Sequence, residues 1–190
     1  VTYSGGRITR VSDGVGREFQ FAYSGNNLAS ITAPDDTSIT YEYVSDCLTS
    51  ITYQNNKKVD ITYSNVILNR WKPVRILLKD NNASVYEVAY SYYYNGRIES
   101  VTEYGYASGA KQKGVCNVYQ YNVAARNTHV STTEPKDTAE GETADRNIRT
   151  VYTFDDNGEV ISRYAYAQDS GRFGVSGEES GINPYAGNDG

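Results

Sequence analysis

The strongest constraint on the fold is a repeat of about 20 residues in the first third of the chain. It is anchored on Ile8, Leu28 and Leu48, and four further positions after each anchor are apolar or aromatic as well. These positions are Val11, Phe19, Phe21 and Tyr23, then Ile31, Ile39, Tyr41 and Tyr43, then Ile51, Val59, Ile61 and Tyr63. A fixed period of this kind indicates one supersecondary unit that is repeated side by side.

The second half of each repeat alternates strictly between apolar and polar residues, as from Ile39 to Tyr43. A period of two is typical of a β-strand with one buried face. Turn-forming pairs separate these segments, among them Asp13-Gly14, Asn95-Gly96 and Asn157-Gly158, and such pairs favour tight hairpins. We therefore predict an all-β fold of about 12 or 13 strands in sequential antiparallel hairpins, with strand over roughly half of the chain and almost no helix.

The opening of each repeat does not fit a flat strand. Leu28 and Ile31 are three residues apart, so regular alternation would send them to opposite faces. We therefore expect a β-bulge or a coiled strand there.

Later repeats keep the pattern but become longer. The residues at their repeat positions include Trp71, Val74, Tyr86, Val88, Tyr90, Ile98, Val101, Tyr119, Tyr121, Thr150, Tyr152, Phe154, Val160, Tyr164 and Tyr166, all apolar or aromatic except Thr150. We predict one β-hairpin repeat domain over residues 1–167, with a mobile acidic loop at 131–145, which lacks apolar anchors. A Gly/Ser-rich tail or linker follows at 168–190.

Composition excludes several classes of protein. The net charge is −5 and the pI is near 4.9, which argues against nucleic acid and anionic membranes as partners. No apolar run is long enough for a transmembrane helix, and no signal-peptide pattern is present. Methionine is absent even at position 1, so we expect a piece of a longer polypeptide.

Three segments resemble the Tyr-Asp-x-x-Gly-x-Leu core of the YD repeat. The first is Phe154-Asp155-Asp156-Asn157-Gly158-Glu159-Val160. The second is Tyr92-Tyr93-Tyr94-Asn95-Gly96-Arg97-Ile98, in which Tyr93 stands where Asp is usual, and Gly6-Arg7-Ile8 repeats its last step. Over residues 1–167 the chain thus resembles YD-repeat, or Rhs-type, proteins, whose relatives include wall-associated bacterial proteins, shell subunits of Tc toxins and teneurins.

The resemblance implies a long β-sheet ribbon that spirals into a shell, in exported, cell-surface or cell-wall proteins. Some members of the family enclose a toxic domain and others act in adhesion. The Rhs core that ends such shells usually carries Asp-Pro steps linked to self-cleavage. This sequence contains no Asp-Pro, so we do not transfer an autoproteolytic activity to it.

No constellation of catalytic or metal-binding residues stands out. His129 is the only histidine, without a nucleophile motif nearby, and we expect it at the surface. Cys47 and Cys116 are isolated, which argues against zinc; free thiols are favoured over a disulfide. We expect Asp155 to Gly158 to form a hairpin turn rather than a calcium loop, because the spacing of an EF-hand is not met. The prediction is no catalytic residue, no metal and no cofactor.

The run Tyr92, Tyr93, Tyr94 is the one feature that the repeat does not require. Exposed aromatic side chains on a sheet can stack on sugar rings or anchor a protein partner, whereas the alternative is a contact between sheets. We take these three residues as candidate ligand-binding residues. Trp71 occupies an anchor position of the repeat, and we expect it in the core.

Two functions remain open at this point. The first is a non-catalytic structural segment of an exported surface protein, which encloses or presents flanking domains of its parent chain. The second is a carbohydrate- or protein-binding adhesion module that uses the tyrosines. Because a bare aromatic face and unpaired edge strands are unfavourable, we expect a strongly twisted, curled or partly closed sheet, with weak self-association through an edge strand as the alternative.

Overall fold

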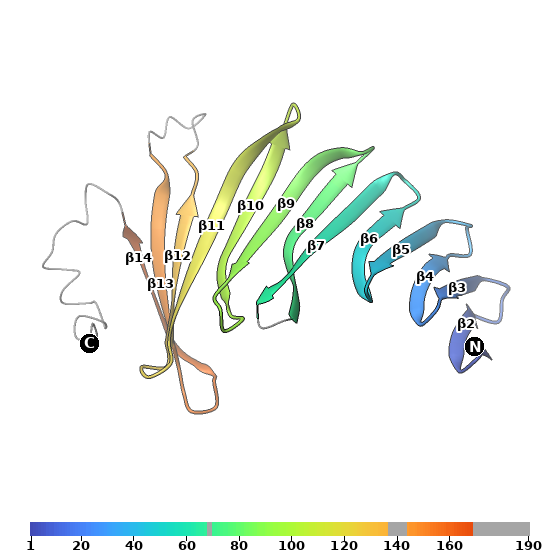
Figure 1. Ribbon diagram of the computed structural model, residues 1–190, viewed down its shortest axis with the longest axis horizontal. Coiled ribbons are helices and arrows are strands. Elements are labelled where there is room, and N and C mark those ends of the chain that lie inside the picture. Colours follow the sequence, from blue (N-terminus) through green and yellow to red (C-terminus); the bar gives the residue numbers. More distant parts are fainter. Residues whose placement is uncertain (68–69, 137–143, 169–190) are drawn as a thin grey trace, which may run out of the picture. The chain divides into compact units, whose positions relative to one another are not determined.

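The computed structural model describes residues 1–67, 70–136 and 144–168, and this part of the chain is all-β without a helix (Figure 1). The prediction of an all-β fold is confirmed, with fourteen strands. The first seven are β1 Thr2–Ser4, β2 Arg7–Ser12, β3 Glu18–Ser24, β4 Asn27–Thr32, β5 Ser38–Val44, β6 Cys47–Tyr53 and β7 Lys57–Ile67. The others are β8 Arg70–Asp80, β9 Ala83–Tyr92, β10 Ile98–Ala107, β11 Ala110–Asn122, β12 Asn127–Glu134, β13 Arg146–Phe154 and β14 Val160–Gln168.

The strands pair in the order of the chain. Each is hydrogen-bonded to the next in one sheet that runs from β1 to β14, as expected for a series of hairpins. Within the described residues β1 and β14 are the outer strands of an unclosed sheet. Among those residues no helix is long and apolar enough to cross a bilayer.

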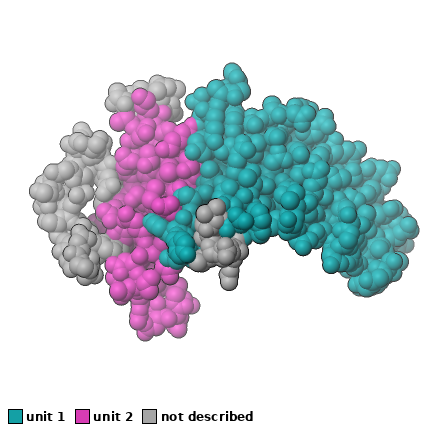
Figure 2. Space-filling model, viewed as in Figure 1, with its two compact units in different colours: residues 1–96, 104–112 teal, residues 97–103, 113–190 magenta. Residues whose placement is uncertain are grey.

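The contacts between residues divide the described chain into two compact units (Figure 2). Unit 1 comprises Val1–Gly96 and Tyr104–Gln112. Unit 2 comprises Arg97–Glu103 and the chain from Lys113 onward. Each unit is described by itself below.

A β-bulge explains the three-residue spacing in each of the first three repeats. In the second repeat Tyr23 pairs with Leu28 and Ala22 pairs with Ser30, which leaves Ala29 as the extra residue. The equivalent extra residues are Thr9 and Thr49, each 20 residues away. The bulge shifts the alternation by one, so the residues at both opening positions face the same side of the sheet. The predicted bulge is confirmed.

Cross-strand pairing in unit 1 aligns the apolar residues of the repeats in rows. One row runs through Phe21, Ile31, Ile39 and Tyr53. A second runs through Tyr41, Ile51, Val59, Leu78 and Tyr86. We call the face that carries both rows the apolar face. Such pairs are the elements that stabilise a sheet.

The sheet nevertheless has almost no interior. Among the described residues the buried apolar ones are Leu77 and Val151, because a single layer offers each side chain only its neighbours on the same face. The prediction that Trp71 lies in the core is wrong: it is 53 % exposed. Single-layer packing therefore leaves even anchor positions of the repeat open to solvent.

The acidic loop is shorter than predicted at its start. Strand β12 continues through Ser131 to Glu134 and pairs with β11 and β13. Backbone pairing thus extends into a segment without apolar anchors, because Thr132 and Thr133 form side-chain hydrogen bonds across the strands. Residues 137–143 of the expected loop and 169–190 of the expected tail lie outside the described residues.

Candidate functional site

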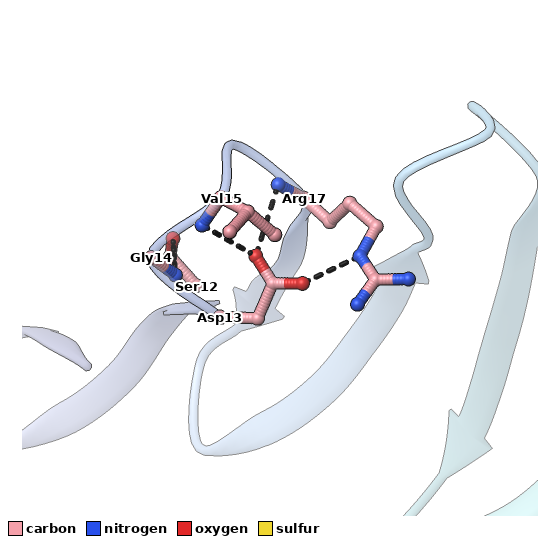
Figure 3. Close-up of polar contacts among 5 residues, drawn as sticks. All are labelled: Ser12, Asp13, Gly14, Val15 and Arg17. Carbon is pink, nitrogen blue, oxygen red and sulfur yellow. Dashed lines mark hydrogen bonds and ion pairs between the residues drawn. The ribbon is translucent and has the colours of Figure 1, made fainter.

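The aspartate at the start of a hairpin turn closes that turn with its carboxylate (Figure 3). Oδ1 of Asp13 accepts hydrogen bonds from the amides of Val15 at 3.0 Å and Arg17 at 3.3 Å, and Oδ2 pairs with Nε of Arg17 at 2.5 Å. The Val15 amide, together with the bonds from Arg17, lowers the pKa of Asp13. This carboxylate is therefore fully used in holding the turn.

The turn that most resembles the YD core has the same geometry. Oδ1 of Asp155 accepts hydrogen bonds from the amides of Asn157 and Glu159, both at 2.9 Å. The motif aspartate is thus a turn-closing residue, and the predicted hairpin turn is confirmed. At the equivalent turn Tyr93 stands in place of the aspartate. Both turns share a backbone hydrogen bond: the amide of Gly96 donates to the carbonyl of Tyr93 at 2.8 Å, and the amide of Gly158 donates to the carbonyl of Asp155 at 3.2 Å.

The most buried carboxylate among the described residues lies in an ion cluster of unit 1. Glu87 is 2 % exposed and accepts from Nε of Arg75 at 2.9 Å, Nζ of Lys111 at 2.5 Å and the hydroxyl of Tyr106 at 2.8 Å. Burial alone would raise the pKa of Glu87, but the bonds from Lys111, Tyr106 and Arg75 outweigh it and lower that pKa. A carboxylate held ionised by three donors is a poor general acid, so the cluster is structural.

His129 is buried, which corrects the prediction of a surface position. It is 2 % exposed, and its Nδ1 accepts a hydrogen bond from Nε of Arg149 at 3.1 Å. Burial, and then the charge of Arg149, lower the pKa of His129 to about 4. The ring is therefore neutral at pH 7, and its Nδ1 is occupied by the bond from Arg149. His129 thus links two neighbouring strands and is not placed as a reacting group.

The two cysteines are free thiols. Sγ of Cys116 accepts a hydrogen bond from the hydroxyl of Thr102 at 3.2 Å. Within residues 1–67, 70–136 and 144–168, no group of three or more His, Cys, Asp or Glu side chains could hold a metal ion.

The three candidate tyrosines differ in their surroundings. The hydroxyl of Tyr92 donates to the carbonyl of Pro73 at 2.7 Å, and Nζ of Lys72 lies 5.4 Å from the centre of its ring. Tyr93 is half-buried in the turn. Tyr94 is 82 % exposed. The structure thus leaves Tyr94 as the residue of this run whose ring a ligand could reach directly.

A concave pocket lies elsewhere in unit 1, where sequence reasoning placed no site. Its volume is about 300 Å³. Its lining comes from the end of β6, the start of β7, the end of β8 and the start of β9: Tyr53, Asn55, Lys57, Lys58, Val59, Leu78, Lys79, Asp80 and Val85. The residues are spread over more than 30 positions of sequence, and only the strand register brings them together, so no local motif could have found it.

No protein-family model matches the chain, and no curated protein matches it. Among solved structures, the crystal structure of TcdB2-TccC3-TEV superposes with a TM-score of 0.61 at 15 % identity over 85 % of this chain. The Tc holotoxin pore of Photorhabdus luminescens superposes with a TM-score of 0.60 at 16 % identity, also over 85 %. The chain spans only 9 % and 8 % of the length of those proteins. The similarity shows that the chain shares its β-repeat fold with a stretch of these Tc toxin components.

Proposed function

We propose that the chain is a non-catalytic structural segment of an exported, cell-surface or wall-associated bacterial protein of the Rhs/YD-repeat kind. In this role the sheet forms part of a wall that encloses or presents flanking domains of the parent chain. The proposal goes beyond the shared fold, which by itself assigns no activity.

The observation that carries the proposal is that the described residues have almost no apolar interior, while several of their ionisable groups are engaged in structural hydrogen bonds. The apolar residues form rows along the strands, and Glu87 and Asp13, together with Nδ1 of His129, are occupied by structural hydrogen bonds. A repeat of this kind grows by adding one hairpin at a time. Such a sheet suits the construction of an extended surface, and the fold shared with Tc toxin components supports this use.

The location can be tested on intact cells of the native host. An antibody against this chain is applied before and after lysis, with a cytoplasmic protein as the control. We expect labelling of intact cells, and loss of the label when the cells are first treated with protease. Labelling that appears only after lysis would contradict an exported surface protein.

The scaffold role is tested in the full parent protein by an in-frame deletion of residues 1–168. We expect the rest of the parent to be cut faster by protease, because its domains lose the wall that covers or positions them. Equal rates of cleavage with and without the segment would contradict the role, even if the location is right.

The second candidate function is an adhesion module for carbohydrate or protein that uses Tyr92, Tyr93 and Tyr94. It is favoured by the 82 % exposure of Tyr94, since a tyrosine ring in water is an effective binding anchor. A glycan array with the wild type and Tyr94→Ala tests it. Tyr3→Ala is the matched control, because Tyr3 is 63 % exposed on β1, away from this run. Binding that is lost equally in both variants, or absent, would contradict a specific role of the run.

A further inference from the structure

The pocket of unit 1 has an apolar lining between two charged residues. Strand register pairs Val59 with Leu78 and Lys57 with Asp80. Because side chains alternate along a strand, Lys57 lies on the same face as Val59, and Asp80 on the same face as Leu78. The four residues are thus on the apolar face, with one cation and one anion at the turn end of the strands.

The turns beside the pocket are tied to one another. The amide of Asn81 donates to the carbonyl of Asn56 at 3.1 Å, and Nδ2 of Asn56 donates to Oδ1 of Asn81 at 3.2 Å. Nδ2 of Asn81 also donates to Oδ1 of Asp80 at 3.0 Å. These bonds hold the β6–β7 turn against the β8–β9 turn, so the position of Asp80 is fixed before any ligand arrives.

The charges of the lining favour a neutral ligand. Lys58 and Lys79 pair with Asp60 through their ammonium groups, at 3.2 Å and 2.6 Å. Among the described residues Lys57 takes part in no ion pair, and the carboxylate of Asp80 lies on the neighbouring strand. A phosphate or carboxylate would meet Lys57 but would be repelled by Asp80, whereas a hydroxyl can donate to Asp80 and accept from Lys57.

The apolar part of the lining is accessible. Tyr53 is 38 % exposed, Leu78 is 40 % exposed and Val85 is 43 % exposed. A binding site for a small polar molecule combines such an apolar surface with a few fixed polar groups. A pyranose ring has the matching chemistry, because it presents C–H groups on its faces and hydroxyls around its edge.

We propose that this pocket binds one neutral pyranose unit of a glycan. The ring packs against Tyr53 and the aliphatic side chains of Val59, Leu78 and Val85, and its hydroxyls bind Asp80, Lys57 and Asn55. The site does not depend on the scaffold role, and it is separate in sequence from the tyrosine run at 92–94.

The test is a titration of the ¹⁵N-labelled chain with four methyl glycosides, those of glucose, galactose, mannose and N-acetylglucosamine, followed by two-dimensional NMR. With at least one of them we expect amide shifts confined to residues 53–59 and 78–85. We expect Tyr53→Ala and Asp80→Ala each to weaken that binding about tenfold, whereas Tyr53→Phe, which keeps the ring, stays within about twofold. Tyr3→Ala is the control for an exposed tyrosine outside the pocket.

Three results would overturn the assignment: no shifts with any of the four glycosides, shifts at residues 92–94 instead of the pocket, or binding that is unchanged in both Tyr53→Ala and Asp80→Ala. A short tyrosine-containing peptide is titrated in parallel. Shifts of the pocket amides with the peptide and not with the sugars would identify a protein-binding site and would also overturn it. The NMR spectrum of each variant reports whether it is folded.

Discussion

The two units hold their strands together by different means. In unit 1, rows of apolar side chains such as Phe21, Ile31 and Ile39 cross the strands. In unit 2, hydrogen bonds between polar side chains link neighbouring strands: Thr132 to Asn117 at 2.7 Å, Thr133 to Asn147 at 2.9 Å and Arg149 to His129. Among the described residues, the buried ones of unit 2 are mostly polar: Thr102, Asn127, His129, Thr150 and Val151. Unit 1 also buries polar residues, Ser50 and Glu87, beside the apolar Leu77.

The difference matters most in a sheet of one layer. Apolar rows that remain half-exposed each contribute little, and their contributions add up over many repeats. A buried polar bond contributes modestly when it is made, and its loss is costly because a buried group is left without a partner. Unit 1 should therefore tolerate single changes in its apolar rows, and unit 2 should be sensitive to single polar ones.

Glu87 is a buried charged residue of unit 1, and its removal should give the largest effect of any single substitution considered in that unit. In Glu87→Ala the chain loses a carboxylate that is 2 % exposed and bound to Arg75, Lys111 and Tyr106. We expect a loss of about 2 to 3 kcal/mol in the free energy of unfolding of this region. This is below the usual cost of breaking a buried ion pair because both cations are partly exposed. Amide hydrogen exchange along β8 and β9 measures it.

The matched control is Glu42→Ala. Glu42 is exposed and, through Ser50, Asp60 and Leu77, lies in the same cross-strand row as Glu87, so its loss should cost no more than about 0.5 kcal/mol. Equal effects of the two changes would mean that the cluster does not stabilise unit 1.

Mild acid should distinguish the units. The pKa of His129 is lowered to about 4 from an ordinary value of 6.5, so between these two values the unfolded chain binds a proton that the folded chain does not. Stability is therefore complete above pH 6.5 and falls as the pH approaches 4, by on the order of 3 kcal/mol. Hydrogen exchange should show β12 and β13 losing protection between pH 6.5 and 4.5, before β8 and β9.

Unit 1 should lose stability only at lower pH, because its buried ionisable group, Glu87, is a carboxylate. Its pKa lies below the ordinary 4.5, so its contribution is present above that value and is lost only as the pH falls through the lower, folded-state pKa. His129 is the only histidine, which makes His129→Gln the decisive variant. The pH dependence between 6.5 and 4.5 should disappear in it, and its persistence would assign the effect to another group.

The contrast between the units also explains what the sequence could predict. The hairpins, the order of the strands and the bulges followed from apolar periodicity and turn residues, which are strong around Ile8, Leu28 and Leu48. The continuation of β12 to Glu134 did not, because a strand held by Thr132 and Thr133 has no apolar signal. The burial of His129 was missed because its partner Arg149 is 20 residues away, and no apolar pattern marks the two residues as neighbours.

Exposure could not be predicted from the pattern either. The position of Trp71 in the repeat was right, but burial depends on a second layer, and periodicity carries no information about whether one exists. The pocket at Tyr53 and Asp80 could not be predicted from the sequence for a related reason. Its residues belong to two different repeats, and the register that joins them is a property of the folded sheet.

A turn in unit 1 is a place where a substitution should stabilise the unit instead of destabilising it. Ser45 and Asp46 have φ values of 49° and 61°, the left-handed conformations of a type I′ turn, which disfavour serine and favour asparagine. Ser45→Asn should raise the free energy of unfolding by about 0.5 to 1 kcal/mol. Urea unfolding measures it, and Ser24→Asn, at a strand end, is the control. A gain in both variants would show that the turn conformation is not the cause.

The smallest effect is expected at two turns of equal geometry, one in each unit, which are closed by Asp13 and Asp155. In Asp155→Ala the amides of Asn157 and Glu159 lose their acceptor, and in Asp13→Ala those of Val15 and Arg17 lose theirs. Exchange of these amides should accelerate several-fold in each variant while the rest of the unit is unchanged, because a surface turn opens locally. Asn substitutions at the same positions keep an Oδ1 acceptor and should preserve most of the protection. If Asp155→Ala instead loosened β13 and β14 as a whole while Asp13→Ala stayed local, the sensitivity of unit 2 would extend to its turns. The distinction between apolar stabilisation in unit 1 and polar stabilisation in unit 2 would then apply to the turns as well as to the strands.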